Sequence, residues 1–165
     1  MSLKLGESAP NFTAQTTEGE IDFYDWAGDE WVVLFSHPAD FTPVCTTELG
    51  RVAALQDEFD KRGVKTIGLS VDPLDEHEEW VPDIEDTQEV QVGYPIIADE
   101  DREISEMYGM MHPEADETHT VRSVFIIDPD KHVRLTITYP APVGRNFDEI
   151  LRAIDALQES DEYDI

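Results

Sequence analysis

The chain alternates between short apolar runs and longer stretches in which apolar residues recur at helical spacing. Four short runs are predicted to be strands: residues 31–35, 65–71, 94–98 and 123–127. Runs of this length without polar interruption are typical of strands buried on both faces of a sheet. Residues 133–139 alternate instead, and the turn residues 128–131 should fold them back on 123–127 as a hairpin.

Residues 12–24 predict one more hairpin near the N-terminus, with Glu18 and Gly19 at its turn. Helical spacing predicts helices at about residues 43–62, from near Asp72 past Trp80, at 102–108, and from Asn146 towards the C-terminus. Pro82 should end or kink the second of these helices. Strands that alternate with helices predict an α/β fold, with a central mixed sheet flanked by helices.

The length of 165 residues suits one domain that spans residues 1–165 and ends in a short acidic tail at about 159–165. Asp and Glu number 38 against 11 Lys and Arg, which gives a net charge of −27. Such a field repels nucleic acid and anionic membranes, so neither is an expected partner. Acidity spread through the whole chain indicates adaptation to high salt, because salt screens the repulsion between carboxylates.

No apolar run approaches the length of a membrane span, and residues 1–4 lack the apolar core of a secretory signal. A single cysteine excludes an internal disulfide. A soluble cytoplasmic protein is therefore expected.

Cys45 is the strongest candidate for chemistry because it follows a buried strand and opens a helix. Pro43 suits the first helical position and Thr42 the N-cap, so Cys45 becomes the third helical residue. The free N–H groups and the positive dipole end of a first turn favour an anion, here the thiolate. A small buried apolar cysteine is the alternative interpretation, since Cys45 also lies on the apolar face of its helix.

The spacing Pro38-x-x-x-Thr42-x-x-Cys45 resembles the peroxidatic motif of the peroxiredoxins. Three longer strings resemble the one-cysteine, AhpC/TSA-like members of that family: residues 37–48, 94–99 and 144–150. The likeness extends from about Leu5 to Gln158. It implies a thioredoxin-like fold and a thiol peroxidase that reduces hydrogen peroxide and organic hydroperoxides without a cofactor.

The resemblance also implies a role for each matching residue. Cys45 would attack the peroxide and become a sulfenic acid. Thr42 would hydrogen-bond the peroxide, and Pro38 would shield the sulfenate from water. Arg122 would hold the thiolate and a peroxide oxygen, although without the family an ion pair at the surface would be the better interpretation of Arg122.

Three supporting residues complete the expected site. Glu48 would orient Arg122, and Arg145 would support Arg122 from outside the layer of residues that touch the sulfur. His37 would sit beside the site, either in a structural hydrogen bond or as a help with resolution or proton transfer. An external thiol or a thioredoxin-like reductant would resolve the sulfenic acid, unless two Cys45 side chains meet. The family also suggests a homodimer or a ring of dimers.

The sequence departs from the one-cysteine pattern in lacking a region after the last core helix, so either the lineage lacks it or the chain is truncated. Without a G-x-S-x-G motif, no phospholipase activity is expected. His77, His112 and His119 lack partners at metal-binding spacing, so no metal is expected. Rival functions are a disulfide reductase, which would need Cys-x-x-Cys, a holdase or scaffold, and a cysteine hydrolase.

Overall fold

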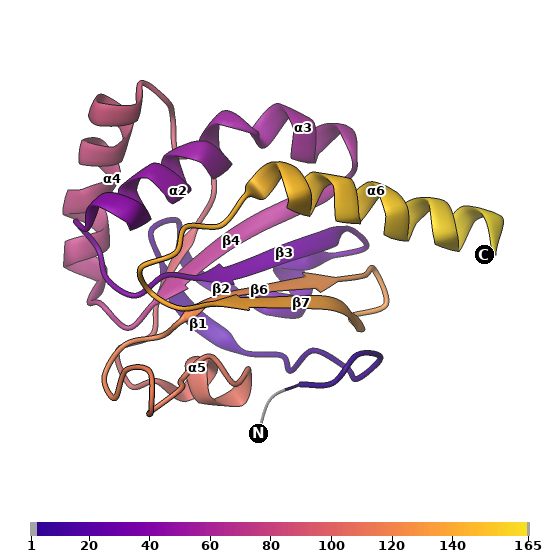
Figure 1. Cartoon of the computed structure of the whole chain (residues 1–165), viewed down its shortest axis with the longest axis horizontal. Coiled ribbons are helices and arrows are strands. Elements are labelled where there is room, and N and C mark those ends of the chain that lie inside the picture. The colour runs from indigo at the N-terminus through magenta and orange to yellow at the C-terminus, as the bar shows by residue number, and fades with distance from the viewer. Residues whose placement is uncertain (1–2, 165) are drawn as a thin grey trace.

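The computed structural model describes residues 3–164. Its centre is a seven-stranded sheet in the order β2-β1-β5-β4-β3-β6-β7 (Figure 1). The strands are β1 (Thr13–Thr16), β2 (Gly19–Asp22), β3 (Trp31–Ser36), β4 (Val64–Ser70), β5 (Ile96–Ala98), β6 (Arg122–Ile127) and β7 (Val133–Tyr139). β4 runs parallel to both β3 and β5, and the other pairings are antiparallel. The sheet is therefore mixed, as predicted.

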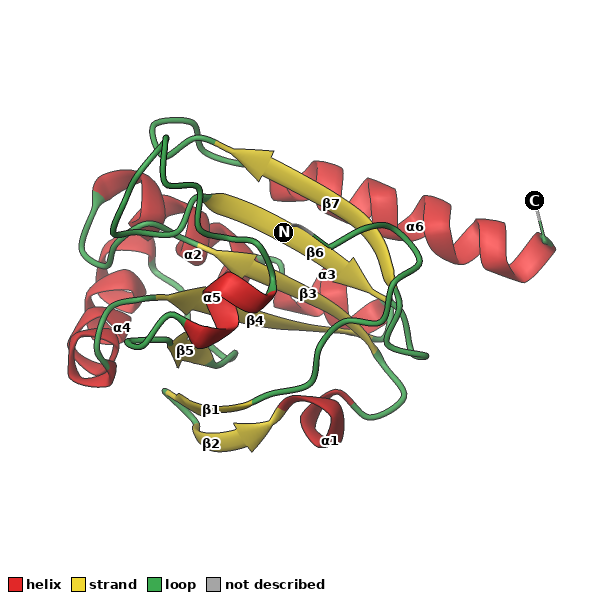
Figure 2. Ribbon diagram, turned by 90° about the horizontal axis from the view of Figure 1, so that it is seen from below, coloured by secondary structure: helices red, strands yellow, loops and turns green. Residues whose placement is uncertain are grey.

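Helices cover both faces of the sheet. They are α1 (Phe23–Ala27), α2 (Pro43–Ala54), α3 (Gln56–Lys61), α4 (Leu74–Gln88), α5 (Glu103–Met107) and α6 (Phe147–Tyr163). α2, α3, α4 and α6 contribute to one buried cluster, and α1 and α5 to the other. Figures 1 and 2 show α5 on the face of the sheet opposite to α2 and α6. Apolar side chains of β3, such as Val33 and Leu34, enter opposite clusters, which explains the unbroken apolar run.

The five predicted strands and the N-terminal hairpin are all present, with two corrections to the hairpin. Its turn consists of Thr17 and Glu18, because Gly19 is already paired in β2, where its φ of 98° favours glycine. Phe23 begins α1 instead of continuing the strand. The side chain of Asp22 accepts a hydrogen bond from the Asp25 N–H and so caps that helix.

The helix expected at 43–62 is two helices, because the backbone leaves helical geometry at Leu55 (φ −93°, ψ 7°). The Leu55 N–H still bonds to carbonyls of the preceding turn, and its side chain is buried. Pro82 does not end the second helix, since it lies inside α4. Trp80 and Ile84, on either side of Pro82, are fully buried, and their packing outweighs the lost backbone hydrogen bond.

α6 begins as predicted, with the Asn146 side chain accepting a hydrogen bond from the Asp148 N–H. Residues 159–163, expected as an acidic tail, continue the helix as far as Tyr163. The stretch between α5 and β6 is irregular, as expected. Within residues 3–164, no helix has both the length and the apolar character that a membrane crossing requires.

The topology brings the loops that follow β3 and β4 and the first residue of β6 to one edge of the sheet. β3 and β4 are parallel, so the loops that follow Ser36 and Ser70 leave from the same edge. β6 is antiparallel to β3, so its first residue, Arg122, lies at that edge too. Residues far apart in sequence thus meet where α2 begins.

Candidate active site

Cys45 lies in the first turn of α2, as the sequence predicts. Pro43 begins the helix, and Thr42 precedes it in extended conformation. Cys45 is the third helical residue and has no exposed surface. The Thr42 side chain makes no capping bond, which corrects the expected cap; its hydroxyl instead donates to the Ala39 carbonyl at 2.8 Å.

Arg122 reaches Cys45 from the first residue of β6. Its Nη1 lies 3.2 Å from the Cys45 Sγ and 2.7 Å from Oε1 of Glu48. Its Nε donates to the Ala141 carbonyl at 2.7 Å. Only 3 % of the Arg122 side chain is exposed. The guanidinium is thus held in the protein interior, beside the sulfur, rather than in a surface ion pair.

Glu48 lies one turn after Cys45, so both side chains share one face of α2. Arg145 binds this carboxylate through three nitrogens: the backbone N at 2.5 Å, Nε at 2.9 Å and Nη2 at 2.9 Å. Burial alone would raise the pKa of Glu48, but the hydrogen bonds and charge of Arg145 outweigh burial and lower it. Glu48 is therefore ionised at neutral pH.

Arg145 is itself immobilised. Its Nη1 donates to the Ser123 carbonyl at 2.7 Å, and its guanidinium lies 5.7 Å and 5.4 Å from the rings of Phe35 and Phe147. Two guanidinium groups therefore bind one buried carboxylate, and one of them, from Arg122, also contacts the sulfur. Their charges balance when the sulfur is a thiolate, which makes this arrangement suited to an anionic nucleophile.

Pro38 and His37 lie in the segment between β3 and α2, and both are buried. The Nε2 of His37 is 2.7 Å from Oδ1 of Asp40, and its carbonyl accepts from the Thr120 hydroxyl at 2.8 Å. Its Nδ1 has no hydrogen-bond partner among the described residues. His37 therefore joins a polar cluster around Asp40 rather than the Arg122–Glu48–Arg145 group.

Sequence reasoning missed Asp40 and the pairing of Asp40 with His77. His77 was considered only as a metal-binding residue that lacks a partner, because nothing local indicates that α4 packs against the loop after β3. The signal available was the i,i+3 spacing of His37 and Asp40 directly after a buried strand.

Two groups of side chains of the kinds that bind metals lie close together in residues 3–164. They are His37, Asp40 and Asp72, and Asp128, Asp130 and His132. In the first group both oxygens of Asp40 already face histidine nitrogens. In the second, Oδ1 of Asp128 accepts two backbone N–H groups of its own turn. In each group the central aspartate, Asp40 or Asp128, already accepts hydrogen bonds from within the protein.

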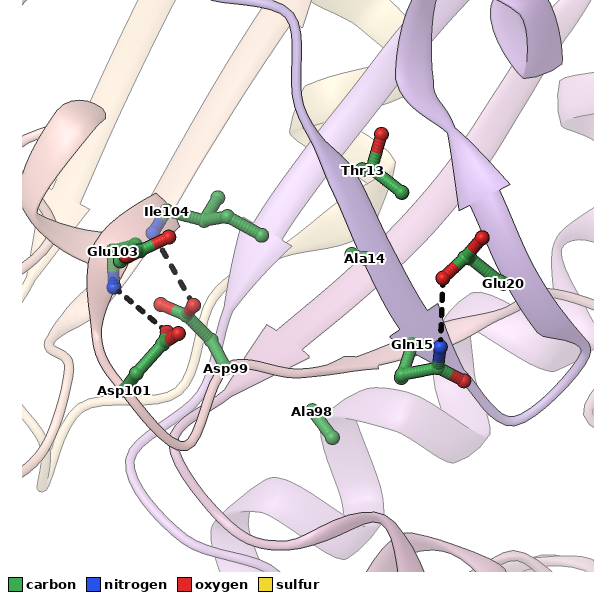
Figure 3. A pocket seen from close by; sticks show the side chains of 9 residues that line it. All are labelled: Thr13, Ala14, Gln15, Glu20, Ala98, Asp99, Asp101, Glu103 and Ile104. Carbon is green, nitrogen blue, oxygen red and sulfur yellow. Dashed lines mark hydrogen bonds between the residues drawn. The ribbon is translucent and has the colours of Figure 1, made fainter.

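A cavity of about 210 Å³ lies between the β1–β2 hairpin and α5, away from Cys45 (Figure 3). Glu20, Asp99, Asp101 and Glu103 are among the residues that line it. The oxygens of Asp99 accept hydrogen bonds from Ile104 and Ser105 and so organise the start of α5. Asp99 therefore has a structural role in this lining.

Comparison with known proteins agrees with this geometry. The AhpC/TSA family model matches residues 5–136. The 1-Cys peroxiredoxin of Dictyostelium discoideum is 53% identical over 163 residues, which cover 99% of this chain and 68% of that protein. A cysteine-to-serine mutant of the Peroxiredoxin 6 of Arenicola marina has a TM-score of 0.90 at 53% identity, covering 95% of this chain and 74% of that one. A yeast mitochondrial 1-Cys peroxiredoxin, studied for its thiol resolving mechanism via glutathione/thioredoxin systems, has a TM-score of 0.92 at 53% identity, covering 97% and 78%.

The fold, the buried cysteine at a helix N-terminus and these similarities show that the chain belongs to the AhpC/TSA family of peroxiredoxins. Within the family it is of the one-cysteine type, a thiol-dependent peroxidase whose single cysteine is Cys45. The predicted thioredoxin-like fold and enzyme class are confirmed.

Proposed function

We propose that Cys45 is the peroxidatic cysteine and that Arg122 activates both the sulfur and the peroxide. The observation that carries this proposal is the 3.2 Å contact between Arg122 Nη1 and Cys45 Sγ in a fully buried site. The thiolate attacks one oxygen of R–O–O–H and the O–O bond breaks. Cys45 then carries S–OH, and the departing R–O⁻ takes a proton to become an alcohol or water.

The surrounding residues divide the remaining tasks. Because the Thr42 hydroxyl donates to the Ala39 carbonyl, its oxygen is left to accept a hydrogen bond from the peroxide O–H. Glu48 holds Arg122 in place, and Arg145 holds Glu48. Pro38, buried at the start of the loop, keeps water from the sulfenic acid.

Resolution requires an external thiol, because the chain has one cysteine. That thiol displaces the hydroxyl of the Cys45 sulfenic acid as water and forms a mixed disulfide, which a second thiol reduces. A small thiol or a thioredoxin-like protein has the required chemistry, as does a second Cys45 in a partner subunit.

The setting of the reaction is part of the proposal. The chain acts as a single domain in a cytoplasm of high salt, and it assembles as a homodimer or a ring of dimers. The net charge of −27 supports the salt, since screening lowers the repulsion within and between subunits.

Rapid mixing of the reduced protein with hydrogen peroxide tests the proposal, with the mass of Cys45 read at each time point. We expect the wild type to consume one peroxide per chain and to gain one oxygen on Cys45, while Cys45→Ser is inert. Peroxide consumption by Cys45→Ser near the wild-type rate would exclude the proposed mechanism.

A further inference from the structure

The loop that leads into α2 is fastened by a buried polar cluster centred on Asp40, whose side chain is only 1% exposed. Oδ1 of Asp40 lies 2.7 Å from Nε2 of His37, and Oδ2 is hydrogen-bonded to Nδ1 of His77. We propose that Asp40 and His77 are positioning residues of the peroxidase, which as a charged pair hold the loop in the shape that places Thr42 and Cys45. The inference rests on the roles proposed above for those two residues.

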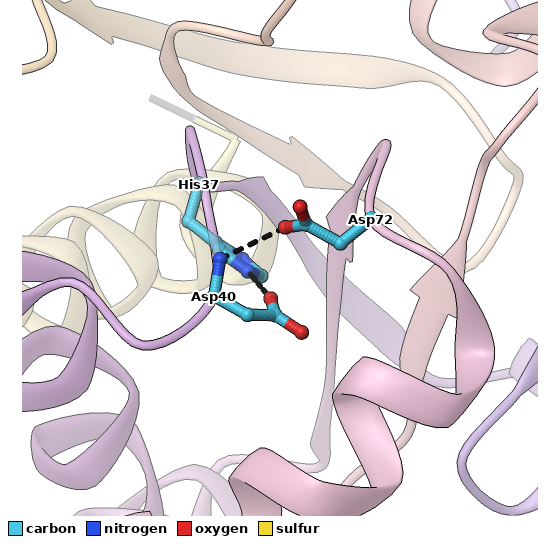
Figure 4. Close-up of side chains that lie close together, drawn as sticks. All are labelled: His37, Asp40 and Asp72. Carbon is cyan, nitrogen blue, oxygen red and sulfur yellow. Dashed lines mark hydrogen bonds and ion pairs between the residues drawn. The ribbon is translucent and has the colours of Figure 1, made fainter.

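The cluster ties the loop to three other elements. The Asp40 N–H donates at 2.8 Å to Oδ2 of Asp72, two residues after the end of β4, and the Ser70 hydroxyl donates to the same oxygen at 2.7 Å. His77 comes from α4, and its Nε2 lies 2.9 Å from the Ile97 carbonyl in β5. Figure 4 shows Asp72 beside the Asp40 backbone and His37 against the Asp40 carboxylate.

The partners of His77 define its charge. The Ile97 carbonyl can only accept a hydrogen bond, so Nε2 carries a hydrogen. Nδ1 faces a carboxylate oxygen of Asp40, which accepts when ionised, so Nδ1 carries a hydrogen as well. His77 is therefore an imidazolium and Asp40 a carboxylate, a pair closed off from solvent on both sides.

The direction of each pKa agrees with this assignment. Burial alone would lower the pKa of His77, but the hydrogen bond and charge of Asp40 outweigh burial and raise it above its ordinary value. Burial would raise the pKa of Asp40, and the hydrogen bonds from His37 and His77 instead lower it. Burial lowers the pKa of His37, which stays neutral and donates through Nε2.

Besides Asp40, three other titratable groups in the described part of the chain lie around His77. They are His37 from the loop, Asp72 after β4, and Glu76 on the same helix, whereas β5 contributes the Ile97 carbonyl. The two carboxylates also favour the charged form of His77.

The backbone next to Asp40 explains why such an anchor is needed. Phe41 has a φ of 62°, in the left-handed region, and its side chain is 48% exposed. This conformation is unfavourable for a residue other than glycine and persists only where the flanking residues are held. Asp40 is held on one side, and the Thr42 hydroxyl is bonded to Ala39 on the other. Without the charged pair the loop can relax, and Thr42 and the first turn of α2 move with it.

The test is the second-order rate constant with hydrogen peroxide between about pH 5 and pH 9, across the titration of histidine. Asp40→Asn and His77→Gln should each react at least tenfold slower at pH 7, since displacements of about 1 Å can cost roughly 10²-fold. The wild-type rate should fall as pH rises through the raised pKa of His77, and His77→Gln should lack that fall. His132→Gln is the matched control, because His132 pairs with Asp128 at 4.0 Å, beyond the opposite end of β6, and should react like wild type.

Nitrogen-15 NMR of the wild-type imidazoles gives a readout that packing alone does not predict. Both nitrogens of His77 should be protonated at pH 7. If Asp40→Asn does not fold, the NMR measurement on the wild type and the rate of His77→Gln together test the positioning role. A neutral His77 at pH 7, or His77→Gln reacting like wild type at every pH, would overturn the inference. If Cys45→Ser is inert while His77→Gln is unaffected, only the positioning role fails; if Cys45→Ser stays active, the proposed function itself fails.

Discussion

A single nitrogen of Arg122 faces both the sulfur of Cys45 and a carboxylate oxygen of Glu48. As the peroxide bond breaks, negative charge moves from the sulfur towards the departing oxygen. A guanidinium that is already fixed beside the sulfur can stabilise both positions of the charge without reorganising. The arrangement therefore provides a guanidinium that Glu48 holds rigidly in place, and not only a positive charge.

Arg122→Ala should slow the reaction with hydrogen peroxide by a factor on the order of 10²–10³, the usual cost of removing a preorganised donor. Arg122→Lys should recover only part of the rate, because an ammonium cannot make the forked contacts to Glu48 and the Ala141 carbonyl. The second-order rate constant from stopped-flow measurements checks both. A loss below about threefold in Arg122→Ala would show that another group activates the peroxide.

Excess peroxide should oxidise Cys45 beyond the sulfenic acid to the sulfinic or sulfonic acid. The chain has no second cysteine to trap the intermediate, and the higher oxidation states are not readily reversed. Intact-mass spectrometry should show two or three added oxygens, and adding a small thiol beforehand should suppress them. Complete recovery of the unmodified mass after reduction would contradict this expectation.

At the scale of elements, the site depends on where strands end and helices begin. β3 delivers the loop that opens α2, and antiparallel pairing of β6 with β3 brings Arg122 to the same edge. α6 begins two residues after Arg145, so the start of that helix lies close to the residue that holds Glu48. The cap of α6 is therefore relevant to stability near the site.

Asn146→Ala should destabilise the fold by about 1 kcal/mol, because it removes the side-chain bond to the Asp148 N–H at the start of α6. Asn146→Asp keeps a capping oxygen and should remain close to wild type. Urea denaturation gives the free energies of unfolding. Equal stability of Asn146→Ala and the wild type would show that the cap contributes nothing here.

At the scale of the whole molecule, negative charge dominates. Arginines near the surface form ion pairs with some of the carboxylates, such as Arg134 with Asp161 at 2.7 Å and Arg62 with Asp155 at 2.6 Å. Exposed pairs of this kind contribute about 0–1 kcal/mol each and leave most carboxylates without a counter-charge. Self-repulsion therefore opposes both folding and assembly at low ionic strength.

The melting temperature and the oligomer mass should both rise from low to molar potassium chloride. The screening length falls from roughly 30 Å at 0.01 M to roughly 3 Å at 1 M, which removes repulsion between distant carboxylates. The rate per site should change little, because hydrogen peroxide is neutral and the charges of the site act at contact distance. Differential scanning calorimetry and light scattering check this, and a flat or falling melting temperature would contradict adaptation to high salt.

Local patterns were enough to predict the strands, most of the helices and the position of Cys45 in a first turn. These features depend on periodicity, on Pro43 and on the N-cap position of Thr42, all of which act over a few residues. The break at Leu55 and the tolerance of Pro82 could not be predicted in this way. Both depend on how α2 and α4 pack on the sheet, and burial there outweighs local preference.

The partners of Cys45 depend on the tertiary structure. Read alone, Arg122 suggested a surface ion pair, and the family resemblance was what assigned it to the site. It is 77 residues from Cys45, and only the pairing of β6 with β3 brings the guanidinium to the sulfur. Asp40 and His77 meet for the same kind of reason, because α4 packs against a loop 37 residues earlier in the chain. Sequence by itself determined that the single cysteine lies in the first turn of a helix, since a helix start is local, whereas the charges around Cys45 are set by contacts that only the fold creates.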